Sequence, residues 1–155
     1  MGVFDLTTFS VDLLRLGLAM ALGALIGAER QLAGQSAGLR THVMVSIGAA
    51  IFTLAGLATA PTESNDVTRV VQGVAAGIGF LGAGTIIKMN GDQQIRGLTT
   101  ASSIWVAAAM GTAAGLGEFA LAASSACIGL FVLVVMRPLS RWLTPKINSG
   151  KSEDN

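Results

Sequence analysis

Residues 11–30 read VDLLRLGLAMALGALIGAER, an apolar run from Val11 to Ala28 that ends at the charged pair Glu29-Arg30. The run's 18 residues would form a helix of about 27 Å, close to the roughly 30 Å of hydrocarbon in a bilayer. A cleaved signal peptide would have a basic segment before the run and small residues after it, and neither is present here. The stretch therefore predicts a transmembrane helix.

Four further apolar runs of similar length follow, at residues 43–59, 70–87, 98–116 and 119–136. Hydrophobic residues make up 52% of the chain and charged residues 12%, with a mean hydropathy of +0.65. Soluble domains carry about 25% charged residues. A soluble fold of this chain would have too little polar surface to cover five such runs. The sequence predicts an all-α polytopic protein with a five-helix transmembrane domain over residues 1–145 and a polar, disordered cytoplasmic tail at 146–155.

Lysine and arginine are distributed unevenly among the loops. If the N-terminus lies outside the cell, eight of the ten fall on the cytoplasmic side: Arg30, Arg40, Lys88, Arg96, Arg137, Arg141, Lys146 and Lys151. Only Arg15 and Arg69 then lie outside. Because basic residues in short loops stay in the cytoplasm, the sequence predicts an N-terminus outside and a C-terminus inside.

The chain contains an internal repeat. Residues 38–57 match residues 97–116 at nine of twenty positions, and the preceding runs also match at an offset of 56, as in Gly23 and Gly79. Both copies cross the membrane in the same order, so the repeat is parallel, with its axis along the membrane normal. We expect two helical hairpins that face one another, with their glycine-rich first helices near the axis and an unpaired fifth helix.

Small residues in these runs predict close helix contacts, because helices in lipid associate through small side chains. The third run also carries a glycine-rich segment consisting of Gly77, Gly79, Gly82 and Gly84. Each interior glycine weakens a helix by about 1 kcal/mol relative to alanine. Two interpretations stay open: tight packing of other helices against bare backbone, or a small polar cavity or ion path.

Polar residues gather at the predicted cytoplasmic ends of the helices. This cytoplasmic-face cluster comprises Glu29, Arg30, Arg40, Thr41, His42, Arg96, Thr99 and Thr100. The cluster has three readings: residues at the membrane interface, a network that locks a hairpin loop with Glu29 accepting from Arg30 or Arg40, or a ligand site. Thr41 and Thr100 suit the capping of helix starts. On the outer face, Asp66 and Arg69 lie one helical turn apart: Asp66 suits the capping of that helix, and Arg69 is expected to pair with Asp66 or with Glu63.

Four segments, GAER at 27–30, AGLRTH at 37–42, GIGFLGAG at 77–84 and RGLTTA at 96–101, carry a family resemblance, together with Asp66, Arg69, Gln72 and Trp105. In order and spacing they resemble the MgtC/SapB family of bacterial inner-membrane proteins. The resemblance implies a regulator of membrane energetics in growth at low magnesium and in virulence, with ATP synthase as a partner. Family members have also been labelled magnesium transporters. Longer members carry a soluble C-terminal domain, which we expect this short form to lack. Gln72 and Trp105 are expected to be packing residues.

The chemistry available in the membrane limits the functions to consider. No acidic residue lies in the middle third of a predicted span, which disfavours a carboxylate magnesium site or an acidic proton relay. One cysteine and one histidine make no metal cluster, so we expect no cofactor beyond a possible association with Mg²⁺. Without a nucleophile–base pair we expect no enzyme. A net charge of +1, with its basic residues explained by topology, gives no reason to expect nucleic acid.

Two hypotheses remain. The first is a regulatory membrane protein that binds another membrane complex, or itself, through glycine-rich helix faces. The second is a transporter or channel for magnesium or another cation, with a path near Gly79–Gly84. Five short helices rich in small residues bury little surface, so we expect a homo-oligomer, most simply a dimer.

Overall fold

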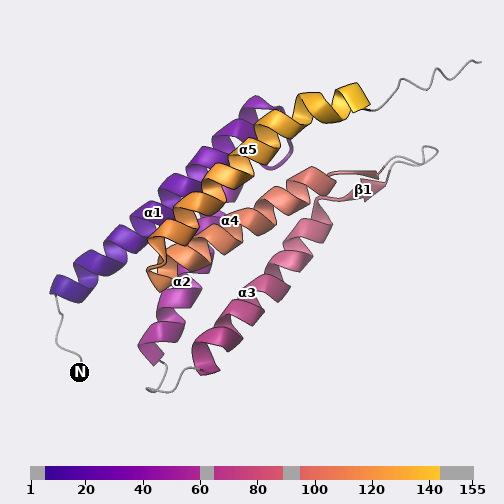
Figure 1. Ribbon diagram of the computed structural model, residues 1–155. Coiled ribbons are helices and arrows are strands. Elements are labelled where there is room, and N and C mark those ends of the chain that lie inside the picture. The colour runs from indigo at the N-terminus through magenta and orange to yellow at the C-terminus, as the bar shows by residue number, and fades with distance from the viewer. Residues whose placement is uncertain (1–5, 60–64, 89–94, 144–155) are drawn as a thin grey trace, which may run out of the picture.

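The computed structural model describes residues 6–59, 65–88 and 95–143 (Figure 1). It comprises five helices and one short hairpin: α1 (Leu6–Leu32), α2 (Leu39–Thr59), α3 (Asn65–Gly84), β1 (Ile87–Lys88), β2 (Ile95–Arg96), α4 (Leu98–Leu116) and α5 (Phe119–Leu143). Helices α1, α3 and α5 run in one direction and α2 and α4 in the other (Figure 1). We call the end with the α1–α2 turn the Arg30 end, and the end with the α4–α5 turn the Gly117 end.

Four of the described helices, α1, α2, α3 and α5, are long and apolar enough to cross a membrane. Helix α4 has 19 residues, about 28 Å, and it contacts each of the other four helices. Eleven of its residues are buried. A helix surrounded by protein can carry serine and threonine at this depth, because those side chains bond to backbone or to other helices rather than meeting lipid. The predicted all-α polytopic membrane fold is confirmed.

Helices α2 and α4 cross at the centre of the bundle. A Cβ atom added at Gly111 would lie 2.0 Å from the Ser46 carbonyl oxygen, and one added at Gly115 would lie 2.9 Å from that of Ala50. The two backbones therefore touch directly. The expectation that the glycine-rich first helices α1 and α3 lie at the axis is wrong, because the second helices of the two hairpins occupy it.

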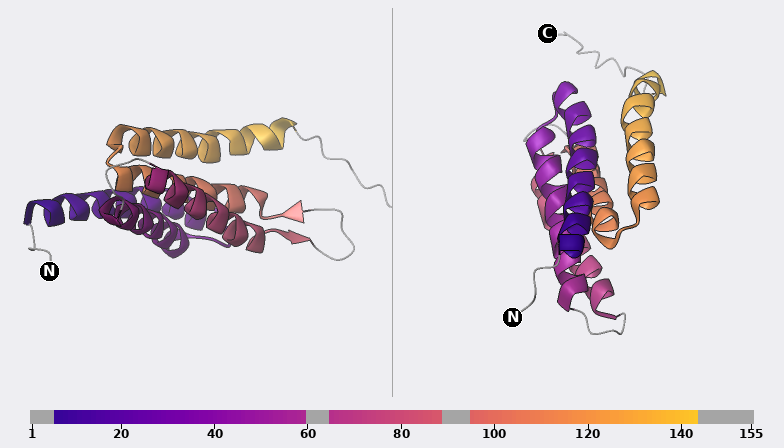
Figure 2. Two further views of the ribbon diagram at one scale, coloured as in Figure 1. Left: turned by 90° about the horizontal axis from the view of Figure 1, so that it is seen from below. Right: turned by 90° about the vertical axis from the view of Figure 1, so that its left-hand side faces the viewer.

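Helix α1 packs on α2 through its own glycines. A Cβ at Gly23 would lie 2.8 Å from the His42 carbonyl oxygen, and one at Gly27 would lie 2.8 Å from the Leu39 Cα. Helix α3 is held less closely. Its described side chains include only two buried positions, Ile78 and Gly82. The views in Figures 1 and 2 show α3 inclined along the edge of the bundle and α5 along another side.

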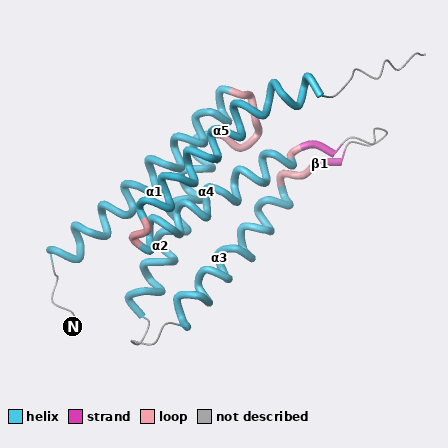
Figure 3. Tube along the Cα trace, viewed as in Figure 1, coloured by secondary structure: helices cyan, strands magenta, loops and turns pink. Residues whose placement is uncertain are grey.

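Helices α1, α2 and α5 extend past the predicted runs and α4 coincides with its run, whereas α3 ends at Gly84, before the predicted end at residue 87. Helix α1 is longer at both ends, and α5 continues through Pro138 to Leu143. Apolar content marks only the part of a helix that lipid or protein covers, whereas backbone hydrogen bonding continues into polar sequence. Most loops between the elements are short (Figure 3). Residues 146–155, predicted to form a tail, lie outside the described residues.

The short hairpin between α3 and α4 was not predicted. Ile87 pairs with Arg96 and Lys88 with Ile95 in antiparallel register. The following residue, Gly97, has a φ of 94° and is the N-cap of α4. A Cβ there would overlap with the Thr85 carbonyl oxygen. Only glycine fits this junction.

Candidate functional site

A buried polar network lies at the Arg30 end, where α1 ends and α2 and α4 begin. Arg30 is 3% exposed, and its guanidinium donates two hydrogen bonds to Glu29: Nε to Oε2 at 2.5 Å and Nη2 to Oε1 at 2.9 Å. Of the two partners considered for Glu29, the structure therefore selects Arg30, while Arg40 is exposed. The bidentate pair neutralises a cation that α1 carries into the bundle.

His42 is fully buried one turn into α2. Its ring Nδ1 lies 2.9 Å from the Gly38 carbonyl oxygen and its Nε2 lies 3.0 Å from Ser103 Oγ. A carbonyl oxygen only accepts, so we assign a proton to Nδ1. Ser103 Oγ also lies 2.8 Å from the Thr100 carbonyl oxygen. The contact joins α2 to α4 across 61 positions of sequence.

The turn between α1 and α2 completes the network through two glutamines. The Thr100 hydroxyl donates to Gln35 Oε1 at 3.3 Å, and the Gln35 backbone N–H donates to the Arg30 carbonyl oxygen at 3.0 Å. The side chain of Gln31 accepts from the Leu39 backbone N–H at 3.2 Å. Start and end of the turn are thereby tied to both α2 and α4.

The predicted cytoplasmic-face cluster divides into two groups. Arg30, His42 and Thr100 are buried and Glu29 is partly buried, whereas Arg40, Thr41, Arg96 and Thr99 are exposed. The capping role expected for Thr41 and Thr100 is wrong at the starts of α2 and α4. Gln31 bonds the first turn of α2, and the N-cap of α4 is Gly97, without a side-chain hydrogen bond.

Sequence reasoning missed Gln31, Gln35 and Ser103. The two glutamines follow the Glu-Arg pair at a four-residue spacing, so both can reach the same side of the turn. That spacing was the available signal. Nothing in the sequence placed Ser103 beside His42, because the contact depends on how α2 crosses α4.

The glycine-rich segment of α3 stays helical through Gly84. A Cβ at Gly82 would meet Ala101 at 3.6 Å, but those at Gly77, Gly79 and Gly84 would meet no atom within 4 Å. Within this chain the segment is thus neither tightly packed nor broken to expose carbonyl groups. All three open glycines are exposed, and Gly77 lies beside the space between α2 and α3.

The remaining predicted residues lie away from the network. Gln72, expected to pack, is exposed on α3, and Trp105 on α4 is 52% exposed. Arg69 is exposed, and the side chain of Asp66 lies outside the described residues, so their predicted ion pair stays a prediction. At the Gly117 end, the Arg15 guanidinium lies over Gly117, with Nη2 3.0 Å from a Cβ placed there.

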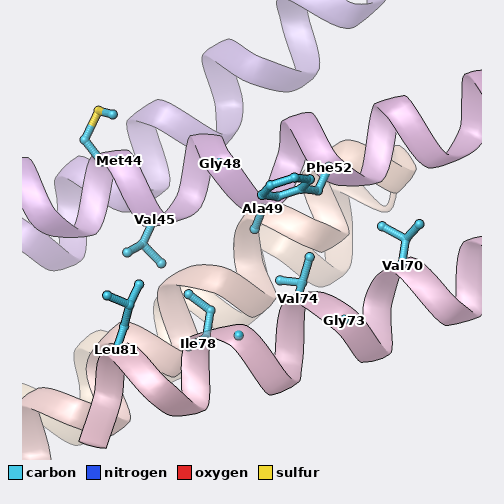
Figure 4. Close-up of a pocket in the computed structure, with 11 residues that line it drawn as sticks. Met44, Val45, Gly48, Ala49, Phe52, Val70, Gly73, Val74, Ile78 and Leu81 are labelled. Carbon is cyan, nitrogen blue, oxygen red and sulfur yellow. The ribbon is translucent and has the colours of Figure 1, made fainter. Parts of the chain in front are cut away.

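An apolar groove of about 690 Å³ separates α2 from α3 (Figure 4). Its lining consists entirely of apolar residues: Met44, Val45, Gly48, Ala49, Phe52, Val70, Gly73, Val74, Gly77, Ile78 and Leu81. Figure 4 shows Phe52 and Val70 toward one end of the groove and Met44 and Leu81 toward the other. Gly48 and Gly73 lie open along its length, since a Cβ at either would meet nothing within 4 Å.

The network neutralises the buried Arg30 guanidinium and fixes the α1–α2 turn, and its one carboxylate, that of Glu29, is already bonded to Arg30. Across the described residues, no group of three or more His, Cys, Asp or Glu side chains lies together. Glu29 gives both its oxygens to Arg30. The arrangement fits the reading in which the cluster locks the α1–α2 hairpin.

Comparison with known proteins places this architecture. The model of the MgtC family matches residues 16–142. Protein MgtC of Salmonella typhimurium strain LT2 is 43% identical over 141 residues, which are 91% of this chain and 59% of that protein. Protein SrpB of Synechococcus elongatus is 41% identical over 83% of this chain and 78% of its own length.

A third relative, named "Putative magnesium transporter YhiD" in Escherichia coli K12, is 41% identical over 79% of this chain and 58% of its own length. The chain spans about 59% of the length of the Salmonella MgtC proteins that it matches. No solved structure matches. The family model covers most of the chain, including the buried network and all five helices from Leu16 onward, and the chain therefore belongs to the MgtC family.

Proposed function

We propose that this MgtC-family protein regulates adaptation to low magnesium and to virulence conditions by binding another membrane protein through the groove between α2 and α3. ATP synthase is the partner that the family resemblance suggests. The groove supports the proposal because it is long, apolar and floored by glycines from two helices. Transmembrane helices associate through such small residues, which let backbones approach closely.

The chain's own contacts supply the comparison. The glycine pair on α1 and the pair on α4 each lie against α2, at distances that leave no room for a Cβ. A Cβ added at either glycine of the corresponding pair on α3, Gly73 and Gly77, would meet no atom of another helix within 4 Å. Glycine pairs of the same spacing thus pack against α2 on α1 and on α4, whereas the pair on α3 has no helix packed against it in the described part of the chain. A partner helix in the groove would use it in the same way, and a second copy of the chain is included among such partners.

We infer that the Arg30 end faces the cytoplasm, with the N-terminus outside the cell and the C-terminus inside. Described loops and helix ends at the Arg30 end carry Arg30, Arg40 and Arg96, and the opposite end carries Arg15 and Arg69. Basic residues in short loops favour this orientation. Topology reporters fused to the two termini should report opposite compartments.

A pair of matched variants tests the groove. Gly77→Leu places a large side chain in the groove, and Gly17→Leu places the same side chain on α1, where a Cβ also meets nothing within 4 Å. Because a Cβ at either position has open space around it, both proteins should accumulate in membranes. We expect Gly77→Leu to lose growth at limiting magnesium in a strain that depends on this protein, and Gly17→Leu to support growth. Equal growth of the two would contradict the proposal.

The second candidate is transport of magnesium or another cation, favoured by the printed name of the Escherichia coli relative. Purified protein in liposomes loaded with a magnesium-sensitive dye separates the candidates. Regulation predicts no influx above that of empty liposomes. Protein-dependent influx that Gly82→Leu abolishes would support transport near the glycine-rich segment and would displace the regulatory proposal.

A further inference from the structure

The hydrogen bonds around His42 can be counted atom by atom, because each neighbour has a fixed role. The Gly38 and Thr100 carbonyl oxygens only accept, and Ser103 Oγ has one hydrogen to give. Three short contacts run in sequence: Gly38 oxygen to Nδ1 at 2.9 Å, Nε2 to Ser103 Oγ at 3.0 Å, and Ser103 Oγ to the Thr100 oxygen at 2.8 Å. Three contacts need three hydrogens.

A neutral ring supplies only two hydrogens to this chain. Nδ1–H donates to Gly38, and the Ser103 hydrogen must then choose between the Nε2 lone pair and the Thr100 oxygen. A protonated ring supplies three. Nε2–H then donates to Ser103 Oγ, and the Ser103 hydroxyl is free to donate to Thr100.

We propose that His42 is a proton-binding site that joins α2 to α4, and that proton uptake at Nε2 turns the Ser103 hydroxyl from His42 to the Thr100 carbonyl. No covalent bond other than N–H forms, and the proton comes from water. The site goes beyond the proposed function of the α2–α3 groove, with which it shares no residue. Its ligand is a single proton.

Ser103 is 3% exposed and lines a second, mostly apolar groove of about 580 Å³ between α4 and α5. The Ser103 hydroxyl therefore stands between this groove and His42 Nε2. Gly23 and Gly27 of α1 lie against the backbone oxygen and the Cβ of His42.

Few charges surround the site. Helix α1 presents the Glu29–Arg30 pair, in which each charge offsets the other. On α2 the only other charged residue is Arg40, which is exposed, and α4 has no titratable side chain between Leu98 and Leu116. Arg96, on β2, is exposed. Apart from His42 itself, the groups that bond to the ring or to Ser103 are two carbonyl oxygens and a hydroxyl, none of which titrates.

The chain has one histidine, so histidine-selective ¹⁵N labelling gives the signals of this ring alone, provided that the purification tag contains no histidine. The protein in lipid bilayers is titrated with acid while the ¹⁵N shifts of His42 and the carbonyl ¹³C shift of Thr100 are followed by NMR. We expect a neutral ring protonated at Nδ1, with Nε2 accepting a hydrogen bond. As Nε2 gains its proton, the Thr100 carbonyl shift should move in step.

Two variants locate the coupling. Ser103→Ala removes the hydroxyl, so the ring signal should still respond to acid while the Thr100 shift no longer follows it. Ser102→Ala is the matched control, since that hydroxyl is exposed and donates to the Leu98 carbonyl one turn away. It should leave the coupling intact.

A neutral ring protonated at Nε2, or a Thr100 shift that stays constant while the wild-type ring titrates, would overturn the proposal. So would a coupled response that persists in Ser103→Ala. The wild-type measurements alone decide the first two outcomes, so the test does not depend on how well the variant folds.

Discussion

Replacing Gly111 with alanine tests the central crossing of α2 and α4. The new Cβ would lie 2.0 Å from the Ser46 carbonyl oxygen and 2.7 Å from its carbonyl carbon. Ordinary van der Waals contact begins at 3.4 Å, so the backbones would have to separate by about 1.4 Å at this point. Both atoms belong to the backbone, so no side-chain rotation can relieve the overlap.

The expected cost follows from the behaviour of overpacked cores. Forcing extra volume into a close-packed interior destabilises by about 1–3 kcal/mol. Alanine returns up to about 1 kcal/mol through its better helix propensity. Separation of α2 from α4 also lengthens the neighbouring contact at Gly115, so we expect the free energy of unfolding to fall by roughly 2 kcal/mol.

Unfolding by SDS in mixed micelles, followed by far-ultraviolet circular dichroism, measures this change. Gly48→Ala is the matched control: it lies on α2 in the same part of the bundle, and its Cβ would meet nothing within 4 Å. The control should be as stable as the wild type or slightly more stable. If the two variants unfold at the same SDS fraction, the backbone contact between α2 and α4 is refuted.

Four further substitutions probe the Arg30 end, the first three by the same unfolding assay. Glu29→Gln leaves the Arg30 guanidinium buried without a counter-charge and should cost roughly 3 kcal/mol, whereas exposed Arg40→Gln should stay within about 0.5 kcal/mol of the wild type. Gln31→Ala removes the side-chain acceptor at the start of α2 and should cost about 1 kcal/mol; no loss would mean that water serves this N–H equally well. Gly97→Ala combines a positive φ with a clash against Thr85 and should reduce the amount of folded protein in membranes, and normal accumulation would contradict the junction geometry.

The number and order of the helices could be predicted because lipid imposes its requirements on every residue of a span. An apolar run of sufficient length has few alternatives to a helix in a bilayer, where each backbone group must bond internally. The starts of α4 and α5, at Leu98 and Phe119, were predicted to the residue. Both helices begin directly after a turn that contains glycine.

Which helices touch could not be predicted from the same patterns. Glycine pairs occur on α1, α3 and α4, and all three predicted contact faces. Only those on α1 and α4 are buried against a neighbour, because α2 has two sides to offer and each is taken by one of them. Periodicity identifies a face that is able to pack, whereas the choice of partner depends on the three-dimensional arrangement of all five helices.

The site was predicted by position more than by role. Arg30, His42 and Thr100 were recognised as polar residues at helix ends, and they are joined through Gln35 and Ser103. Their partners escaped notice because Gln31, Gln35 and Ser103 are uncharged and common at such positions. A charged residue in an apolar stretch indicates that a partner is required. The hydroxyl or amide side chain that serves as the hydrogen-bond partner has no distinct pattern in the sequence.

The repeat carries a consequence for function. Gly23 and Gly79 are counterparts in the two copies, yet a Cβ at Gly23 would meet α2 at 2.8 Å while one at Gly79 would meet nothing. The two copies of the repeat therefore pack differently. In the first hairpin the glycines of α1 lie against α2, whereas in the second hairpin Gly79 of α3 does not lie against α4. An unpacked glycine face lacks van der Waals contacts with a neighbouring helix, and helices in lipid depend on such contacts because no hydrophobic effect drives their association. A partner seated on α3 would restore to the second hairpin the contact that α1 and α2 already share in the first.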